Sequence, residues 1–446
     1  MPDQFPKRIM MISTHGYVSA APELGCPDTG GQVVYVLEVA KQLARTGCQV
    51  DILTRRFEGR PEVETVAEGL RVLRFPCGGD DFIPKESVCE HIPEWVGHAA
   101  SYIRRERLRY DVVNSHYCDA GLAGVALAAR AGAPHVHTPH SLGAWKRDSM
   151  GGDPAELERK YDFRRRIRDE RKVYAASDLL LATTPVQRGV LETPEYSVPP
   201  ERIRVLPPGY DDTRFSPVSP LARHSIRHRL GVRGPMVLAL GRAARNKGFD
   251  LLVRAMPAVL ARVPDARLWL AIGSSRPADE ERRELAALSE LAAGLGIADR
   301  VELRGHVPDD QLADHYRCAD VFALSSRYEP VGMTAIEAMA CGTPCVITTE
   351  GGLWELVTYG RDALYADPFL PRAFARALCQ VLEQPRLAER LGRNGLARVR
   401  AGFTWRNVAL GVANAFQSAT RRWHATGADH HARRPTRLVG VGGSAA

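Results

Sequence analysis

The sequence predicts an α/β fold made of two doubly wound domains that face a central cleft. Short apolar runs alternate with helical patterns along most of the 446 residues. This alternation is typical of parallel sheets built from βα units. It stops once, at a turn-rich stretch near the middle of the chain, and then restarts. A chain of this length has room for two or three domains, so two domains of similar size are the simplest interpretation.

The first half has expected strands where apolar runs are bounded by turn formers. They are Ile9–Thr14, Val50–Arg55, Leu70–Pro76, Val112–His116, His135–Thr138, Leu179–Thr183 and Ile203–Leu206. Helical periodicity lies between several of these runs. The expected helices are Gln32–Gly47, Pro93–Arg105, Ala120–Ala131 and Leu157–Ser177.

A linker is expected from Pro207 to Pro217, where turn formers replace periodicity. The second half then continues the pattern. Its expected strands are Met236–Gly241, Leu268–Ile272, Val301–Arg304, Val321–Leu324, Cys345–Thr348 and Ala363–Ala366, and its helices include Phe249–Val263 and Asp279–Leu295.

These patterns divide the chain. We expect one domain over residues 1–210 and another over 211–403, with a helix over 404–423 that packs back on the first domain. Residues 424–446 are rich in Gly, Ala, His and Arg, and they are expected to form a disordered tail.

Bulk properties exclude several classes of protein. No apolar run approaches a membrane span, and the N-terminus lacks the apolar core of a signal peptide, so a cytoplasmic location without a membrane partner is expected. The net charge is +8, but aromatic residues make up only 7% and the basic residues lie among acidic ones, which disfavours a nucleic-acid partner. The nine cysteines form no Cys-x-x-Cys pair and are expected to be reduced and mostly buried. Nothing in the sequence indicates an oligomeric state.

The most informative run is Ser325–Pro344, in which two glutamates flank a glycine-bearing turn. A strand end, a loop and a helix start form a natural anion site, because the N–H groups of the first helical turn are unpaired. Pro330 keeps Glu329 in the loop, whereas Glu337 lies inside the helix that starts near Met333. The run therefore indicates a phosphate-bearing ligand with hydroxyls. The alternative is a capping box in which Glu337 turns back onto the N–H of Thr334.

Two further loops stand out, because each follows the first expected strand of its half and contains glycines or cations. Gly30 and Gly31 precede a helix and let the backbone approach a ligand, although a lone Gly-Gly is usually only a turn. The run is not Gly-x-Gly-x-x-Gly, so a nicotinamide cofactor is disfavoured. In the second half, Arg242 and Lys247 follow the first strand and could both reach a diphosphate. The alternative is a solvated basic loop.

Histidines and cations mark the rest of the first half. His135, His137 and His140 lie at a strand end, but Pro139 breaks the strand and no carboxylate or cysteine is near in sequence, so a polar contact from one histidine is favoured over a metal. Pairs of aspartates at 80–81 and 211–212 are typical of turns. Four cations would form a dianion pocket if they converge, and a helix surface otherwise. They are Lys85, Lys146, Arg165 and Arg166.

Taken together, these segments resemble one family. From about Ile9 to Trp423 the chain is similar to retaining GT-B glycosyltransferases of family 4, in the sucrose-phosphate synthase branch, whose fold has two Rossmann-like domains. The motifs that carry the resemblance are Thr14-His15-Gly16, Asp28-Thr29-Gly30-Gly31-Gln32, His140-Ser141-Leu142-Gly143, Arg242 with Lys247, and Glu329 through Glu337.

The resemblance implies roles for these residues toward a nucleotide sugar. His140 would bind the transferred sugar near its 6-hydroxyl, with its backbone carbonyl near the anomeric carbon. Arg242 and Lys247 would neutralise the leaving diphosphate. Glu329 would bind the region of the sugar 3-hydroxyl, and Glu337 the ribose hydroxyls. The remaining implied donor residues are Gly30, Gly31, Val331, Gly332, Met333 and Thr334.

The resemblance also implies a phosphorylated acceptor, fructose 6-phosphate, and no metal or other cofactor. The donor would be GDP-mannose, with UDP- or ADP-glucose as the alternative. Two departures from the family pattern affect donor choice, namely Val331, where Phe is commoner, and Leu353-Trp354-Glu355 after the Gly-Gly pair. The implied acceptor residues are Gln32, Lys85, Tyr117, Ser141, Lys146, Arg165 and Arg166.

Overall fold

A computed structural model describes residues 6–22, 30–57, 59–275 and 277–425. The motif residues Asp28 and Thr29, one of the nine cysteines, Cys26, and nearly all of the expected tail lie outside these ranges. The remaining eight cysteines are free, and all but Cys89 are buried. None of the helices in these ranges combines the length and apolarity that a membrane crossing needs.

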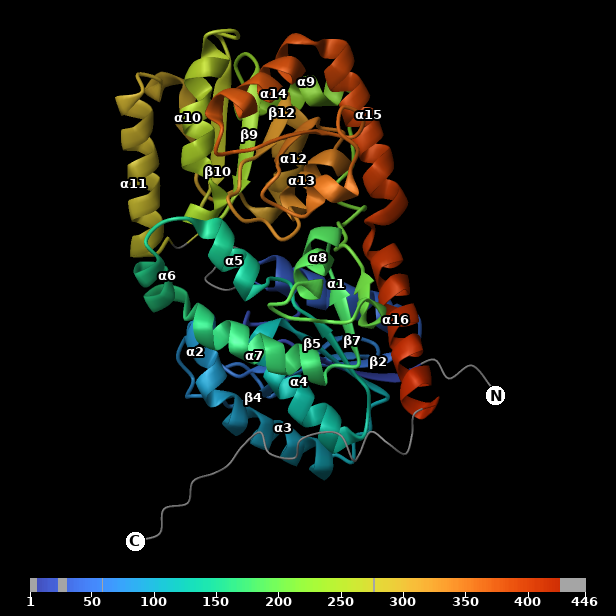
Figure 1. The fold of residues 1–446 in the computed structure, drawn as a ribbon. Coiled ribbons are helices and arrows are strands. Elements are labelled where there is room, and N and C mark those ends of the chain that lie inside the picture. The colour runs from blue at the N-terminus through green and yellow to red at the C-terminus, as the bar shows by residue number, and fades with distance from the viewer. Residues whose placement is uncertain (1–5, 23–29, 58, 276, 426–446) are drawn as a thin grey trace.

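Two sheets form the framework, as predicted (Figure 1). The strands of the first sheet are β1 (Arg8–Ile12), β2 (Gln49–Arg55), β3 (Val63–Ala67), β4 (Leu70–Phe75), β5 (Val112–His116), β6 (His135–Thr138), β7 (Leu179–Ala182) and β8 (Ile203–Val205). Those of the second are β9 (Met236–Gly241), β10 (Arg267–Ile272), β11 (Val301–Leu303), β12 (Val321–Leu324), β13 (Cys345–Thr348) and β14 (Leu364–Ala366).

Both sheets have a doubly wound strand order. The first is β3-β4-β2-β1-β5-β6-β7-β8 and the second is β11-β10-β9-β12-β13-β14. Every named strand pair is parallel except β3 with β4, which is antiparallel. β3 was not predicted, since this edge strand is largely exposed and its sequence, Val-Glu-Thr-Val-Ala, is no continuous apolar run.

Helices cover both faces of each sheet. In the first half they are α1 (Gly31–Arg45), α2 (Lys85–Val88), α3 (Ile92–Arg105), α4 (Tyr117–Ala131), α5 (Gly143–Met150), α6 (Pro154–Tyr161), α7 (Phe163–Ala176) and α8 (Pro185–Glu192). In the second half they are α9 (Pro220–Leu230), α10 (Phe249–Leu260), α11 (Asp279–Gly294), α12 (Leu312–Cys318), α13 (Met333–Ala340), α14 (Pro371–Glu383), α15 (Pro385–Gly402) and α16 (Trp405–Ala425).

Alternate residues of each central strand enter different cores, which explains their continuous apolar runs. In β1, Ile9 and Met11 pack in the cluster that contains α1 and α16, whereas Met10 and Ile12 pack against α3 and α4. In β9, Met236 and Leu238 lie on one side and Val237 on the other.

The expected helix over Leu157–Ser177 is wrong as a single element. It is divided at Asp162, whose φ of 44° is left-handed and whose side chain accepts a hydrogen bond from the Arg165 N–H. Asp is one of the few residues that tolerates this conformation, and it caps the helix that follows. The break redirects the chain, so that α7 presents its first turn toward α2.

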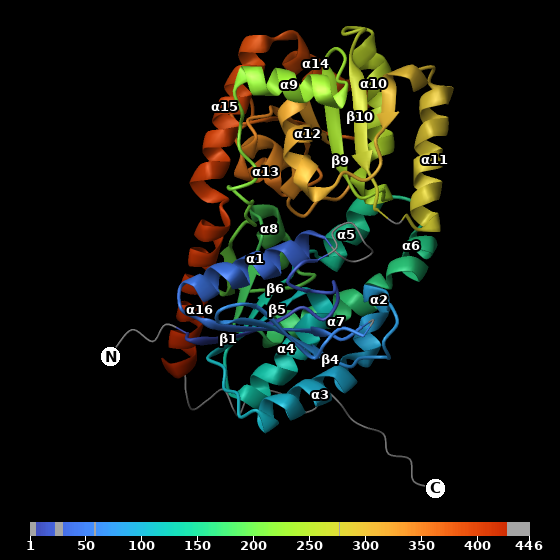
Figure 2. The same ribbon diagram turned by 180° about the vertical axis from the view of Figure 1, so that it is seen from behind.

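The chain crosses between the domains twice, at neighbouring points. Tyr210 forms a parallel bridge with Thr404, and its N–H donates to the carbonyl of Phe403 at 2.8 Å. After the second crossing, α16 lies against α1, and Trp405, Val408 and Phe416 join the core of the first sheet (Figure 2). α16 thus completes the first domain, although it follows the second domain in sequence.

Candidate active site

Two sets of loops face each other where the domains meet, and both lie at the carboxyl ends of parallel strands, where such sheets bind ligands. In the first domain they follow β1, β5 and β6, and in the second they follow β9 and β12. Figure 1 shows α1, α5 and α8 at the level between the two sheets. Nearly all of the predicted site residues lie on these loops or on the helices that follow them.

The loop after β12 holds Glu329 rigidly. Its N–H donates to the Glu350 carbonyl at 3.1 Å, and its own carbonyl accepts from the Gly352 N–H at 3.0 Å. The residue is only 8% exposed, and its Oε2 lies 2.7 Å from Lys247 Nζ and 3.0 Å from Ser326 Oγ. The structure therefore joins two predicted site residues, Glu329 and Lys247, in one ion pair. Arg242, on the same loop as Lys247, is exposed.

The turn before α13 requires glycine. Gly332 has a φ of 101°, and a Cβ there would lie 2.8 Å from the Leu324 side chain. α13 begins at Met333, next to Thr334, with no side-chain cap, so its first N–H groups are directed toward the interface between the domains. Gly31 of the first domain lies against this end, since a Cβ there would be 2.9 Å from Met333 Sδ. Val331 packs in the core of the second domain and is 8% exposed.

Glu337 does not form the capping box considered above. Its Oε2 accepts a hydrogen bond from the Tyr316 hydroxyl at 2.7 Å, one turn into α13. Burial raises the pKa of Glu337 to about 7. The Glu337 carboxylate is half-buried, it points away from the start of its own helix, and burial makes its ionisation costly. Such a carboxylate is available to a ligand that donates hydrogen bonds.

His140 is the one histidine of its run that reaches the loop edge. Its φ of 57° is left-handed, its Nε2 lies 2.9 Å from His116 Nδ1, and its carbonyl accepts from Gln187 Nε2 at 3.0 Å. Burial, with the nearby charge of His15, lowers the pKa of His140 to about 3, so its ring is neutral. His135 and His137 instead bond Ser115 inside the core.

The predicted acceptor residues come from five helices and one loop, and Arg166 contacts two of them, Ser141 and Tyr117. Its Nε is 2.8 Å from a buried Glu170 oxygen, and Nη2 donates to the Ser141 carbonyl at 2.9 Å and to Ser141 Oγ at 3.1 Å. Its guanidinium lies 4.7 Å from the ring centre of Tyr117. Gln32 of α1 also lies on this side, and its Nε2 donates to Ser13 Oγ at 3.1 Å.

Lys146 of α5 lies among other cations. Its Nζ is 3.7 Å from the ring centre of Tyr161. Burial, followed by the positive charges of three neighbours, holds the pKa of Lys146 well below its usual range. These neighbours are Arg166, Lys85 and Arg242. Like charges gathered from separate elements favour an anionic ligand.

Arg165 has a different environment from Arg166. It forms ion pairs with Glu90 and Asp162, each at 2.8 Å, and it bonds the Glu86 carbonyl. These contacts hold the segment that starts with Lys85, which itself lies 3.3 Å from the Glu86 carboxylate. The structure thus places Arg166 among the cations of the site, whereas Arg165 supports the segment that carries Lys85.

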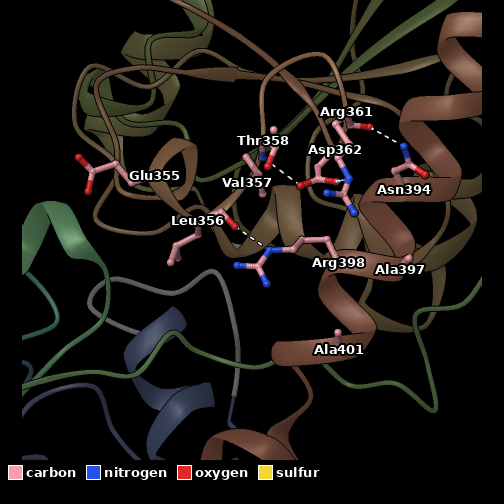
Figure 3. A pocket seen from close by; sticks show the side chains of 10 residues that line it. All are labelled: Glu355, Leu356, Val357, Thr358, Arg361, Asp362, Asn394, Ala397, Arg398 and Ala401. Carbon is pink, nitrogen blue, oxygen red and sulfur yellow. Dashed lines mark hydrogen bonds and ion pairs between the residues drawn. The ribbon is translucent and has the colours of Figure 1, made fainter.

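Two hollows lie away from these loops. One, of about 480 Å³, is lined by the segment after Glu355 and by α15 (Figure 3). Its polar groups bond one another, because Arg398 Nε donates to the Leu356 carbonyl at 2.8 Å and Asn394 donates to the Arg361 carbonyl at 3.1 Å. The other, of about 720 Å³, lies between α10 and α14. Neither contains a predicted site residue. No cluster of His, Cys, Asp or Glu suited to a metal occurs in the described ranges.

Sequence reasoning missed several residues that organise the site. Glu170, which bonds Arg166 and the Gly143 N–H, carried no motif signal, and neither did Gln187, which holds the His140 carbonyl. Tyr328 stood inside the most informative run but had no assigned role. Its hydroxyl contacts Ser141 of the other domain at 2.9 Å.

Comparisons with known proteins identify the family of this chain. The model of Glycosyltransferase Family 4 matches residues 29–214, and that of Glycosyl transferases group 1 matches residues 223–398. The chain is 49% identical over 411 residues to mannosylfructose-phosphate synthase of Agrobacterium fabrum, covering 91% of this chain and 90% of that protein. It is 34% identical to D-inositol 3-phosphate glycosyltransferase of Acidothermus cellulolyticus, covering 93% and 91%.

A solved structure extends the similarity to the whole fold. Sucrose-phosphate synthase from Thermosynechococcus elongatus superposes with a TM-score of 0.82 at 30% identity, over 94% of this chain and 100% of that one. The predicted α/β architecture of two facing domains is thereby confirmed. The chain belongs to the family 4 glycosyltransferases and is a glycosyltransferase of the GT-B fold.

Proposed function

We propose that this glycosyltransferase moves mannose from GDP-mannose to fructose 6-phosphate with retention of configuration, giving mannosylfructose 6-phosphate. The observation that carries the proposal is the group of cations around Lys146, which faces the loops of the second domain and suits a phosphorylated acceptor. The 49% identity to mannosylfructose-phosphate synthase supports the donor sugar.

The proposed mechanism is front-face displacement, in which the departing phosphate oxygen takes the proton of the acceptor hydroxyl. Glu329 is held by Lys247 and Ser326 and is assigned to the sugar hydroxyls, so no covalent intermediate is proposed. Arg242 and Lys247 supply positive charge for the leaving diphosphate, and a metal-independent reaction is therefore proposed. The neutral His140 ring suits a hydrogen bond to a sugar hydroxyl rather than an ionic role.

A second candidate is synthesis of sucrose phosphate from UDP- or ADP-glucose. The structural match to sucrose-phosphate synthase, at a TM-score of 0.82, favours it. A donor panel separates the two candidates. GDP-mannose, UDP-glucose and ADP-glucose are each incubated with fructose 6-phosphate, and products are identified by mass spectrometry. We expect a hexosyl-hexose phosphate product from GDP-mannose. Product only from the glucose donors would replace the mannosyl assignment with the second candidate.

Donor binding is expected to depend on the ionisation of Glu337. With a pKa of about 7 in the free protein, the carboxylate is mostly protonated at pH 6 and loses acceptor capacity for ribose hydroxyls. The affinity for GDP should therefore fall about 10-fold as the pH decreases from 8 to 6. Isothermal titration calorimetry across this range measures the change.

Two variants test the assignment of this pH dependence. Glu337→Gln should flatten it. Tyr316→Phe should move the midpoint to higher pH, because the Tyr316 hydroxyl stabilises the charged carboxylate. A pH profile that is unchanged in both variants would assign the titration to another group.

A further inference from the structure

Tyr328 is the side chain of the second domain that enters the acceptor side of the first. It follows β12 and is only 3% exposed. Its hydroxyl lies 2.9 Å from Ser141 Oγ and accepts a hydrogen bond from the Leu142 N–H at 3.2 Å. Its ring meets the edge of Trp145, with ring centres 5.0 Å apart. Burial raises the pKa of Tyr328 to about 12, so the hydroxyl is neutral at physiological pH.

On the acceptor side, this hydroxyl continues a chain of hydrogen bonds. Ser141 Oγ also accepts from Arg166 Nη2 at 3.1 Å, and Arg166 Nε lies 2.8 Å from Glu170. Ser141 is therefore bonded at once to a cation of the acceptor cluster and to the other domain. Ser141 thus links the contacts of Arg166 to those of Tyr328.

On the donor side, the Tyr328 backbone is joined to the loop that carries Lys247. The Tyr328 N–H and carbonyl both bond Asn246, each at 3.4 Å, and Asn246 immediately precedes Lys247. Glu329, the next residue after Tyr328, forms the 2.7 Å ion pair with Lys247. One residue thus has its hydroxyl in the acceptor half and its backbone in the donor half.

We propose that Tyr328 is a positioning residue that couples the two half-sites, so that a bound phosphorylated acceptor strengthens binding of the nucleotide and the reverse. This inference rests on the proposed function for the identity of the acceptor. The hydroxyl bonds Ser141 and Leu142 only when the domains stand as they do here, and ligands that favour this arrangement assist each other reciprocally.

The test compares coupling in the wild-type enzyme and in Tyr328→Phe, which keeps the ring against Trp145 and removes the hydroxyl. The dissociation constant of GDP is measured by calorimetry with and without saturating fructose 6-phosphate. We expect the acceptor to tighten GDP binding about 10-fold in the wild type and less than about 2-fold in the variant. GDP binding alone should change little, since Glu329 and Lys247 are intact.

Tyr110→Phe provides the matched control. It removes another buried hydroxyl, which bonds Asp51 at 2.8 Å within the first domain. This variant should lower the thermal stability and keep the full coupling, which separates a structural effect from a positioning one. Equal coupling in the wild type and in Tyr328→Phe would overturn the inference.

If the proposed function is wrong, the experiment gives a different result from the one that overturns the role of Tyr328. If the wild type does not bind fructose 6-phosphate, the acceptor assignment fails. Inorganic phosphate then serves as the probe of the cation cluster, with GDP and UDP as probes of the donor half. Absence of coupling between phosphate and either nucleotide in the wild type would also overturn the role of Tyr328.

Discussion

Lys247→Met is expected to lower kcat by about 100- to 1,000-fold, the range found when one group that stabilises developing charge is removed. Methionine keeps the length of the side chain and deletes its charge. The variant loses the cation proposed for the leaving diphosphate, and it also leaves Glu329, which is 8% exposed, without its ion-pair partner. Steady-state kinetics with saturating donor and acceptor measure the effect.

Arg245→Met is the control for this prediction, because Arg245 belongs to the same short helical turn, Arg245–Lys247, and is exposed. It should change kcat less than about 3-fold, in line with substitutions at exposed positions. A similar loss in both variants would mean that the net charge of the loop, rather than Lys247, supports the reaction.

Lys146→Met is expected to raise the KM for fructose 6-phosphate about 100-fold and to leave the KM for the nucleotide sugar within about 2-fold, because charge-assisted contacts to phosphate are lost. The low pKa of Lys146 adds a pH effect. The protonated form attracts the dianion, so the affinity for the acceptor should fall as the pH rises through this lowered pKa, and the variant should lose that dependence.

Lys160→Met is the matched control. Lys160 lies 5.6 Å from the centre of the same Tyr161 ring, but it forms an ion pair with Glu280 and is 48% exposed. It should leave both KM values unchanged. Equal increases in the two KM values for Lys146→Met would contradict its place in the acceptor half.

Much of the fold could be predicted because central parallel strands, buried on both faces, have continuous apolar sequences. The expected runs at β1, β5 and β12 are strands in the structure. Asp162 was missed because periodicity continues through it, and only its left-handed backbone divides α6 from α7. Prediction was weakest where a local conformation or an exposed edge, as in β3, overrides the hydrophobic pattern.

The sequence names candidate site residues one by one, but it does not show which of them contact each other. The ion pair of Lys247 with Glu329 and the contact of Tyr328 with Ser141 join residues far apart in sequence, and they depend on how two sheets are placed. The difference between Arg165 and Arg166 arises from the start of α7, where successive side chains point about 100° apart. Adjacent arginines therefore have different partners.

The packing of α16 on α1 affects the order in which the two domains fold during synthesis of the chain. Val33, Val36 and Val39 of α1 share one buried cluster with Trp405, Val412 and Phe416. Domains generally fold in order as the chain leaves the ribosome, but here the part of the first core that Trp405, Val412 and Phe416 fill stays open until α16 has been synthesised. The first domain therefore completes its core only after the second domain has been synthesised. A stop codon before Trp405 removes these side chains and is therefore expected to destabilise the domain that is translated first.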